Sequence, residues 1–393
     1  MLSGSDAALR VLYLASTKSQ GGIERHSVDL ASALREKGVA VQYACSPGGY
    51  VEAWCAERGI PTLPFRVRNS GDLGAVFRLA GLIRAQRIDV VHAHSRRDYV
   101  IVVLGTALAR LGSPRHPHLI LHAHMNRPLG SPPRLSGRFF AWGADAVVAV
   151  SGTVADRLRS DHQFSHTLVC RIYNGIPLGD YAPPGSAEAR ALREEARHEW
   201  GYPPSALVLG VVGRLDAKGQ ASLVRVLPDL GRRFPDLRLV LIGSEGEPGA
   251  RAELDALASE GGVADRLTYT GPREDVPRLL SGLDVLVHLP RDEAFGLALA
   301  EAMAAGLPTV ATRIGGCREV VQEGTTGLLV EPGDLPALST ALEFLLDPAE
   351  GAARRTAMGG AGRQVVEAEF TRGRQVALLL ALYQKVCASD FVS

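Results

Sequence analysis

The feature that most constrains the fold of this chain is a regular alternation of short β-rich runs with helical patterns. A run at 10–15 is followed by a loop at 16–22 and by a stretch at 24–37 whose apolar residues approximate helical spacing. The same alternation predicts further strands at 39–44, 88–92, 119–122, 146–150, 168–172, 207–212, 237–242, 267–270, 285–288 and 309–311. It indicates an α/β fold with parallel sheets covered by helices on both faces.

The chain is too long for a single hydrophobic core. Its 393 residues exceed the roughly 250–300 residues at which chains divide into domains. The alternation breaks at 182–205, where Pro-Pro-Gly at 183–185 precedes a charged helical segment that Pro-Pro at 203–204 closes. We therefore expect two doubly wound, Rossmann-like domains that face each other across a cleft. The N-terminal domain is expected at 1–182, a linker with the first helix at 183–205, and the C-terminal domain at 206–369. A helix at 370–393 is expected to pack back on the first domain.

Composition excludes several classes of protein. Hydrophobic residues make up 46% and charged residues 22%, which is typical of a globular chain. The net charge of +1 gives no reason to expect nucleic acid as a partner. Five cysteines without a Cys-x-x-Cys pair argue against a disulfide framework or a structural zinc. No apolar run approaches the roughly 20 residues of a spanning helix, and no signal peptide is visible, so a cytoplasmic location is expected.

Positive charge is concentrated in the N-terminal half. Residues 58–138 contain thirteen arginines against three aspartates and no lysine or glutamate, a net charge of +10. The end of this stretch and the residues just after it are predicted to form a helix that combines cationic and aromatic side chains: Arg134, Arg138, Phe139, Phe140 and Trp142. Such a helix fits peripheral contact with an anionic inner leaflet, and it fits equally a helix whose aromatic residues are core and whose arginines are solvated.

Ligands of open parallel sheets bind at the carboxyl ends of the strands, often with phosphate at a helix N-terminus. After the strand at 207–212 comes Gly-Arg-Leu-Asp-Ala-Lys-Gly, in which Arg214 and Lys218 suit a diphosphate. The alternative is a solvated basic turn. Neither the Gly-x-Gly-x-x-Gly fingerprint nor the P-loop pattern is present, which counts against a dehydrogenase or a P-loop ATPase.

The segment at 292–303 is the most informative one. Gly296 marks the turn into a helix, which places Glu293 in the loop and Glu301 about one turn inside the helix. A carboxylate accepts paired hydrogen bonds from vicinal hydroxyl groups, so both glutamates suit sugar rings. The alternative is a helix-dipole partner for Glu293 and a solvated Glu301, but the apolar residues around Glu301 argue against mere solvation.

In order and spacing, these motifs resemble a known family. The chain is similar to the retaining GT-B-fold glycosyltransferases typified by bacterial glycosyltransferase family 4. The resemblance covers nearly the whole length and rests on the Glu293/Glu301 pair together with the motifs at 21–24, 89–94, 121–124, 149–151, 173–176, 213–219, 269–271, 306–308 and 315–316. The chain departs from the family at 243–246, where Gly-Ser-Glu-Gly stands in place of Gly-x-Gly-Pro, and near 317–318, where a proline is missing.

The resemblance implies a donor site. Arg214 and Lys218 would hold the donor diphosphate and neutralise the departing nucleoside diphosphate, and Glu301 would bind the ribose. The donor sugar would be bound by Glu293, by the backbone of Phe295, Gly296 and Leu297, and by His124 (or His122). The Gly22 amide would approach the phosphate or the acceptor. No Asp-x-Asp occurs, so the mechanism is expected to need neither a metal ion nor a cofactor.

The resemblance and these residues predict a transferase that moves a hexose or amino-hexose from a nucleoside diphosphate sugar, with a UDP-sugar favoured. The sugar would go to a hydroxyl of a glycan, lipid-linked or phosphorylated acceptor. The expected process is envelope polysaccharide or lipopolysaccharide synthesis. The alternatives are a hydrolysing nucleotide-sugar epimerase and a non-catalytic nucleotide-sugar-binding subunit. An anionic acceptor would suit the charged residues that follow strand ends in the first domain: Glu24, Arg25, His94, Arg96, Arg97 and Arg127.

Overall fold

The computed structural model describes residues 8–18, 21–129, 133–162, 164–165 and 168–388. They form two compact units. The first comprises the described residues of Met1–Tyr173 and Arg372–Ser393, and the second comprises Asn174–Thr371. The first unit thus ends before residue 182, where the sequence placed the boundary, and the whole of 183–205 belongs to the second unit. Helix α15 (Arg372–Ala388) returns to the first unit.

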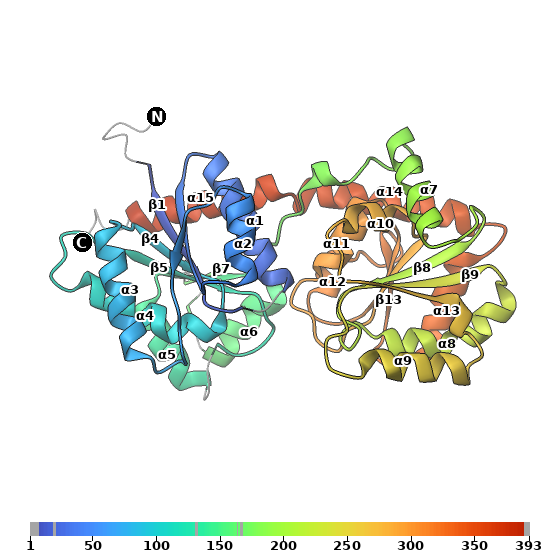
Figure 1. Cartoon of the computed structure of the whole chain (residues 1–393), viewed down its shortest axis with the longest axis horizontal. Coiled ribbons are helices and arrows are strands. Elements are labelled where there is room, and N and C mark those ends of the chain that lie inside the picture. Colours follow the sequence, from blue (N-terminus) through green and yellow to red (C-terminus); the bar gives the residue numbers. More distant parts are fainter. Residues whose placement is uncertain (1–7, 19–20, 130–132, 163, 166–167, 389–393) are drawn as a thin grey trace. The chain divides into compact units, whose positions relative to one another are not determined.

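The first unit contains a parallel seven-stranded sheet in the order β3-β2-β1-β4-β5-β6-β7. Helices cover both faces of this sheet, with α1 and α15 on one face and α3, α4 and α5 on the other (Figure 1). Its strands are β1 (Arg10–Ala15), β2 (Ala40–Cys45), β3 (Thr62–Pro64), β4 (Val90–Ala93), β5 (His118–Ala123), β6 (Ala146–Ala149) and β7 (Val169–Arg171). Its remaining helices are α1 (Gly22–Glu36), α2 (Tyr50–Glu57), α3 (Leu73–Ala85), η1 (Arg96–Asp98), α4 (Tyr99–Arg110), α5 (Pro133–Gly143) and α6 (Gly152–His162).

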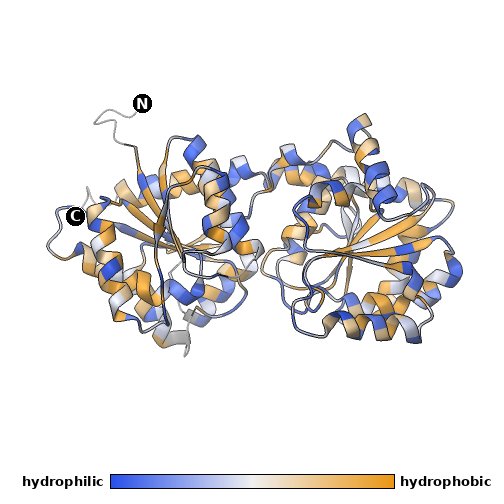
Figure 2. Ribbon diagram, in the orientation of Figure 1, coloured by the Kyte–Doolittle hydropathy of each residue, from blue (hydrophilic) through white to orange (hydrophobic). Residues whose placement is uncertain are grey.

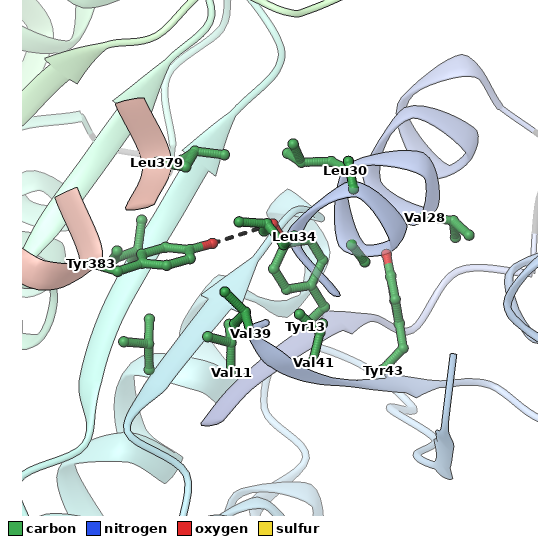
Figure 3. Close-up of a cluster of buried hydrophobic side chains, with 14 of the residues drawn as sticks. Val11, Tyr13, Val28, Leu30, Leu34, Val39, Val41, Tyr43, Leu379 and Tyr383 are labelled. Atoms are coloured by element: carbon green, nitrogen blue, oxygen red, sulfur yellow. Dashed lines mark hydrogen bonds between the residues drawn. The ribbon is translucent and has the colours of Figure 1, made fainter. Parts of the chain in front are cut away.

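Helix α15 is an integral part of the first core. Its Leu379 and Tyr383 are fully buried with Leu30 and Leu34 of α1. Figure 3 shows the Tyr383 hydroxyl directed at the hydroxyl of Tyr13 on β1, 3.2 Å away. Since fully burying a side chain of this size contributes about 1.5–3 kcal/mol, the last helix stabilises the first unit and not the one from which the chain has just emerged.

The second unit contains a parallel six-stranded sheet in the order β10-β9-β8-β11-β12-β13. Its strands are mostly apolar, and polar residues gather on the helices around them (Figure 2). The strands are β8 (Leu207–Val212), β9 (Leu237–Ile242), β10 (Leu267–Gly271), β11 (Val285–His288), β12 (Thr309–Thr312) and β13 (Gly327–Val330). The helices are η2 (Leu178–Asp180), α7 (Ala187–Glu199), α8 (Gln220–Arg233), α9 (Ala250–Glu260), η3 (Ala264–Arg266), α10 (Val276–Ser281), α11 (Leu297–Ala304), α12 (Cys317–Val320), α13 (Leu335–Leu346) and α14 (Gly351–Glu369).

The predicted doubly wound α/β architecture is confirmed. Every strand expected from the sequence is present, with ends shifted by one or two residues. Two strands were not predicted, β3 and β13. Both lie at an edge of their sheet, and β3 is only three residues long and ends in proline, which leaves little signal to read. Among the described residues, no helix combines the length and the apolarity needed to cross a bilayer.

Candidate functional site

In both sheets the strand order reverses beside the first strand of the unit, between β1 and β4 and between β8 and β11. Loops that leave neighbouring strands at such a point diverge to opposite faces of the sheet and leave room for a ligand at the carboxyl ends. In the second unit these loops are 213–219 after β8 and 289–296 after β11. They carry most of the residues that the sequence assigned to the donor.

The loop after β8 is built around two glycines. Gly213 and Gly219 have φ angles of +134° and +77°, which side chains with a Cβ rarely adopt. At Gly219 a Cβ would also lie 2.4 Å from the Leu289 carbonyl oxygen. The Gln220 amide donates to the Arg214 carbonyl at 2.8 Å. The loop is therefore fixed at both ends, and Lys218 is directed toward the loop that follows β11.

Glu293 is the centre of the site. One of its carboxylate oxygens accepts from the Lys218 ammonium at 2.7 Å and from the Nε2 of His288 at 2.9 Å. Burial alone would raise the pKa of Glu293, but the hydrogen bond from His288 and the charge of Lys218 outweigh it and lower the pKa to about 2. Burial lowers the pKa of His288, so this ring is neutral at pH 7 and donates one proton. The carboxylate is ionised and retains capacity to accept from hydroxyl groups.

Arg214 differs from Lys218 in its surroundings. Its guanidinium side chain is 59% exposed and lies 3.2 Å from the carboxylate of Asp216. Gly246 approaches this pair so closely that a Cβ there would lie 2.0 Å from an Asp216 oxygen. The loop thus presents an open guanidinium beside a half-buried ammonium, the two kinds of donor that suit a diphosphate.

Helix α11 begins at Leu297, four residues after Glu293. Gly296 is its N-cap at a φ of +99°, with no side-chain cap, so the amide of Leu297 belongs to the uncapped first turn of the helix. Phe295 is buried and packs edge-on against Phe370 at 5.5 Å, so only its backbone is available to a ligand. Glu301 lies on the same helix and is partly exposed.

Two further features of this site escaped the sequence analysis. His288, the last residue of β11, is 1% exposed and orients Glu293. The signal was a histidine that ends an otherwise apolar strand. The second feature is a close approach between two loops: the Gly316 amide donates to the Glu293 carbonyl at 3.0 Å, and a Cβ on Gly316 would lie 2.4 Å from the Phe295 Cα. The glycine pair at 315–316 is therefore required by packing against the Glu293 loop.

The candidate residues of the first unit begin at α1. Ser19 and Gln20, which open the glycine-rich loop, lie outside the described residues. Gly22 is exposed at the start of α1, where a Cβ would meet nothing within 4 Å. The Glu24 carboxylate folds back to the position that a Cβ on Gly21 would occupy, and burial raises its pKa. Arg25 extends away over the Trp54 ring at 5.8 Å.

A buried aspartate holds the loop after β1 in place. Asp98 is fully buried and accepts from the Ser16 amide at 2.8 Å and from the Ser16 hydroxyl. The Ser16 carbonyl in turn accepts from the Ser46 hydroxyl at 2.6 Å. Asp98 therefore joins the ends of β1, β2 and β4. The sequence offered one hint, an acid within an arginine-rich stretch, and we did not assign it.

The arginines assigned to an acceptor differ in how they are engaged. Arg97 donates to the carbonyls of Val67 and Arg68 at 3.1 and 3.0 Å. Arg96 donates to the Leu129 carbonyl at 3.1 Å. Both side chains therefore anchor neighbouring loops. Arg127 is exposed, at the end of the loop that follows β5.

The two candidate histidines of the first unit are in contact. His124 and His94 approach through Nε2 and Nδ1 at 3.0 Å. His94 is only 3% exposed, whereas His124 is partly exposed and His122 is fully buried. Of the two histidines on β5 and its end, only His124 is partly exposed to solvent.

Matches to known families agree with this architecture. Residues 20–180 match the family "Glycosyltransferase Family 4", and residues 206–348 match "Glycosyl transferases group 1". The two matches follow each other along the chain and lie on the two sheets. The chain therefore carries a domain of each of these two families, on a GT-B fold.

Individual relatives carry related names. The chain is 34% identical over 251 residues to a GDP-mannose-dependent alpha-(1-6)-phosphatidylinositol monomannoside mannosyltransferase of Mycolicibacterium smegmatis, an alignment that covers 61% of this chain and 62% of that protein. It is 29% identical over 411 residues to a D-inositol 3-phosphate glycosyltransferase of Xylanimonas cellulosilytica, covering 93% and 92%. The structure of Anabaena Alr3699/HepE with UDP and glucose aligns with a TM-score of 0.82 at 22% identity, covering 96% and 100%, and shows a shared fold.

Proposed function

We propose that the protein transfers a hexose or amino-hexose from a nucleoside diphosphate sugar to a hydroxyl of a phosphorylated or lipid-linked acceptor, with retention of the anomeric configuration. The observation that carries this proposal is the Lys218–Glu293 pair at the ends of β8 and β11, with Arg214 on the same loop. Together these residues offer two cations that can bind a departing diphosphate and an ionised carboxylate that can accept hydrogen bonds from sugar hydroxyls.

The chemistry follows from where charge develops. When the bond between sugar and diphosphate breaks, negative charge grows on the departing phosphate oxygen, and fixed cations there lower the barrier. Arg214 and Lys218 supply these cations, so the transfer needs no divalent ion. Glu293, held by His288 and Lys218, keeps its orientation while it accepts from the sugar. Glu301 on α11 binds the ribose.

The nucleoside base is the part of the proposed donor that the structure and the resemblance define least. The sequence resemblance favours a UDP-sugar, whereas the name of the mycobacterial relative points to GDP-mannose. A screen of both nucleotides and their sugars by thermal shift decides between them, since a ligand at 100 times its dissociation constant adds about 2.7 kcal/mol of stability.

The acceptor is proposed to carry phosphate. Both curated relatives described above are named for phosphate-bearing inositol compounds, and Arg127 offers an exposed guanidinium at the end of β5. The remaining candidates, Glu24 and Arg25, lie in the first turn of α1. We place the reaction on the cytoplasmic side of the envelope, in polysaccharide or lipopolysaccharide synthesis.

The test is product analysis with purified full-length protein, donor and acceptor. Retention predicts that the anomeric signal of the product in NMR matches the donor configuration, with unchanged turnover in EDTA. An inverted product would overturn retention, and activity restored only by magnesium or manganese would overturn the metal-independent step. Free sugar and nucleotide formed at full rate without acceptor would favour the hydrolysing epimerase.

A further inference from the structure

The first unit contains a cluster of histidines whose position follows from the sequence. His92 and His94 are two residues apart at β4, and His122 and His124 are two residues apart at β5. Side chains at i and i+2 of a strand share one face. Because β4 and β5 are adjacent and parallel, with His92 opposite Ile120, all four imidazoles lie on the same face of the sheet, at its carboxyl end.

Three of these rings are buried. His92 and His122 are fully buried, and His94 is 3% exposed. Burial lowers the pKa of His92 to about 3 and lowers that of His94 and His122 well below the ordinary value. Three imidazole rings are therefore enclosed together, away from solvent.

Hydrogen bonds account for only part of their polar atoms. The Nδ1 of His92 contacts the Tyr383 hydroxyl at 2.6 Å, and its Nε2 lies 3.2 Å from the Nδ1 of His122. The Nδ1 of His94 contacts His124 at 3.0 Å. The Nε2 atoms of His94 and His122 have no hydrogen-bond partner among the described residues. Since an unsatisfied buried polar atom costs about 1–3 kcal/mol, two of them in one cluster call for an explanation.

The distances fit a metal ion. One nitrogen from each of His92, His94 and His122 lies within 4.8 Å of the other two. Zinc–nitrogen bonds of about 2.0–2.1 Å place ligand atoms of a tetrahedral site about 3.3 Å apart. Binding of an ion would draw the three nitrogens closer together, to this separation. Ligands that are all imidazole select zinc, cobalt, nickel or copper over magnesium and calcium, which take oxygen.

The surroundings also match those of a metal centre. Ligating histidines usually engage their second ring nitrogen in a hydrogen bond that fixes the ring, as His92 does with Tyr383 and His94 does with His124. Tyr383 is itself held by the hydroxyl of Tyr13 (Figure 3). His124 is the partly exposed member of the group, which gives an ion a way in from solvent.

We propose that His92, His94 and His122 form a site for one divalent transition-metal ion, zinc before the others, with a water molecule as the fourth ligand. The ion is bound and no bond of the sugar donor is made or broken on it. The site lies in the first unit and is independent of Lys218 and Glu293 in the second. Its effect is to join the ends of β4 and β5 to α15 through Tyr383.

The experiment uses the full chain, stripped with a chelator and dialysed against zinc or cobalt. We expect about one equivalent of either ion to remain bound, with the visible absorption of tetrahedral cobalt and a raised Tm. Magnesium should give neither effect. Binding below roughly 0.1 equivalent at saturating free ion, or an octahedral cobalt spectrum, would overturn the proposal and leave a hydrogen-bonded core cluster.

Variants locate the ion. His92→Gln and His122→Gln should each lose the bound equivalent and the cobalt absorption, whereas the exposed His116→Gln and His198→Gln should keep both. Retention of the equivalent by folded His92→Gln and His122→Gln, or its loss in the surface variants, would contradict the assignment. If the buried variants fail to fold, the stoichiometry and spectrum of the wild-type chain still decide the question.

Discussion

The ammonium of Lys218 lies 2.7 Å from the carboxylate of Glu293, a residue 75 positions further along the chain. Neither group is fully buried: their side chains are 25% and 15% exposed. The pair links the loop after β8 to the loop after β11 and contributes to the lowered pKa of Glu293. It therefore fixes the position of the Lys218 ammonium, the cation that we propose for the donor diphosphate.

Loss of either cation should reduce turnover. Arg214→Ala and Lys218→Ala each remove a charge where the leaving group forms, and we expect kcat/KM to fall about 100-fold to 1000-fold. Lys218→Arg should restore part of the rate, because the charge is kept but the ammonium geometry is lost. The exposed Arg225→Ala on α8 is the control and should leave kcat/KM unchanged. Near-wild-type turnover in both alanine variants would contradict the diphosphate assignment.

The two glutamates should be separable by calorimetry. Glu301→Ala is expected to weaken binding of the free nucleoside diphosphate, because it removes the ribose contact. Glu293→Ala should leave that affinity nearly unchanged and lower kcat, since its partner is the sugar. Glu253→Ala, exposed on α9, serves as the control. Equal losses of affinity in both variants would refute the division of roles.

The Glu293 pair also predicts a pH dependence of stability. The folded pKa of about 2 lies below the ordinary value of 4.5, so this carboxylate stabilises the fold above pH 4.5 and loses that contribution as the pH falls toward 2. Glu293→Gln should lower the free energy of unfolding by about 1–3 kcal/mol at neutral pH. The difference from wild type should shrink in urea titrations below pH 4.5. A difference independent of pH would show that the lost contact is not ionic.

The sequence predicts those parts of the fold and of the candidate site that depend on residues close together along the chain. Strands such as β8 and β11 carry their own signal, and glycines at 213, 219 and 296 mark loops whose backbone no other residue fits well. The candidates Lys218 and Glu293 could be named because each follows a strand end. Their ion pair, and the role of His288 in it, could not be predicted, because they depend on the path of two loops in space. The histidine cluster was missed for a similar reason: the two His-x-His patterns coincide only through the register of β4 with β5.

A buried ionic network in the second unit should be essential to stability. Asp284 accepts from Arg197 at 2.8 Å, from Arg193 at 2.6 Å and from the Val208 amide at 2.7 Å, and the side chains of Asp284 and Arg197 are 8% and 3% exposed. Asp284→Asn leaves a buried guanidinium without its charge partner, and we expect a loss of about 3–5 kcal/mol.

A surface ion pair provides the control for that measurement. Asp229 and Arg232 also form an ion pair, but their side chains are 74% and 75% exposed. Asp229→Asn should change the free energy of unfolding by less than about 0.5 kcal/mol, because exposed pairs contribute little. Thermal and urea unfolding of both variants tests this contrast. A small effect of Asp284→Asn would mean that the network is compensated by water.

The membrane proposal needs one correction from the structure. Phe140 is 2% exposed and packs against Tyr99 at a ring distance of 6.2 Å, so it belongs to the core and not to an interfacial patch. The side chain of Arg134 lies outside the described residues. Trp142 is 65% exposed on the same helix, so the helix is amphipathic. Phe140 belongs to the core, and Trp142 stays a candidate for the membrane contact.

Four exposed apolar side chains of α3 and α5 are the candidates for this contact. Helices α3 and α5 cover the same face of its sheet (Figure 1). They expose Leu73, Phe77, Leu135 and Trp142, at 64%, 66%, 66% and 65%. Exposed apolar groups of this size among arginines suit the boundary between headgroups and acyl chains. We propose this surface as the contact with an anionic bilayer.

Liposome flotation tests the contact. The protein should float with vesicles that contain anionic lipid at low salt and be released as ionic strength rises, because each basic residue near the surface contributes about 1 kcal/mol that salt screens. Phe77→Ser and Trp142→Ser should reduce flotation without changing kcat on a soluble acceptor. Phe344→Ser removes a side chain of 40% exposure from the second unit and should have no effect. If wild-type protein stays in the soluble fraction at low salt, the acceptor must reach the enzyme in solution.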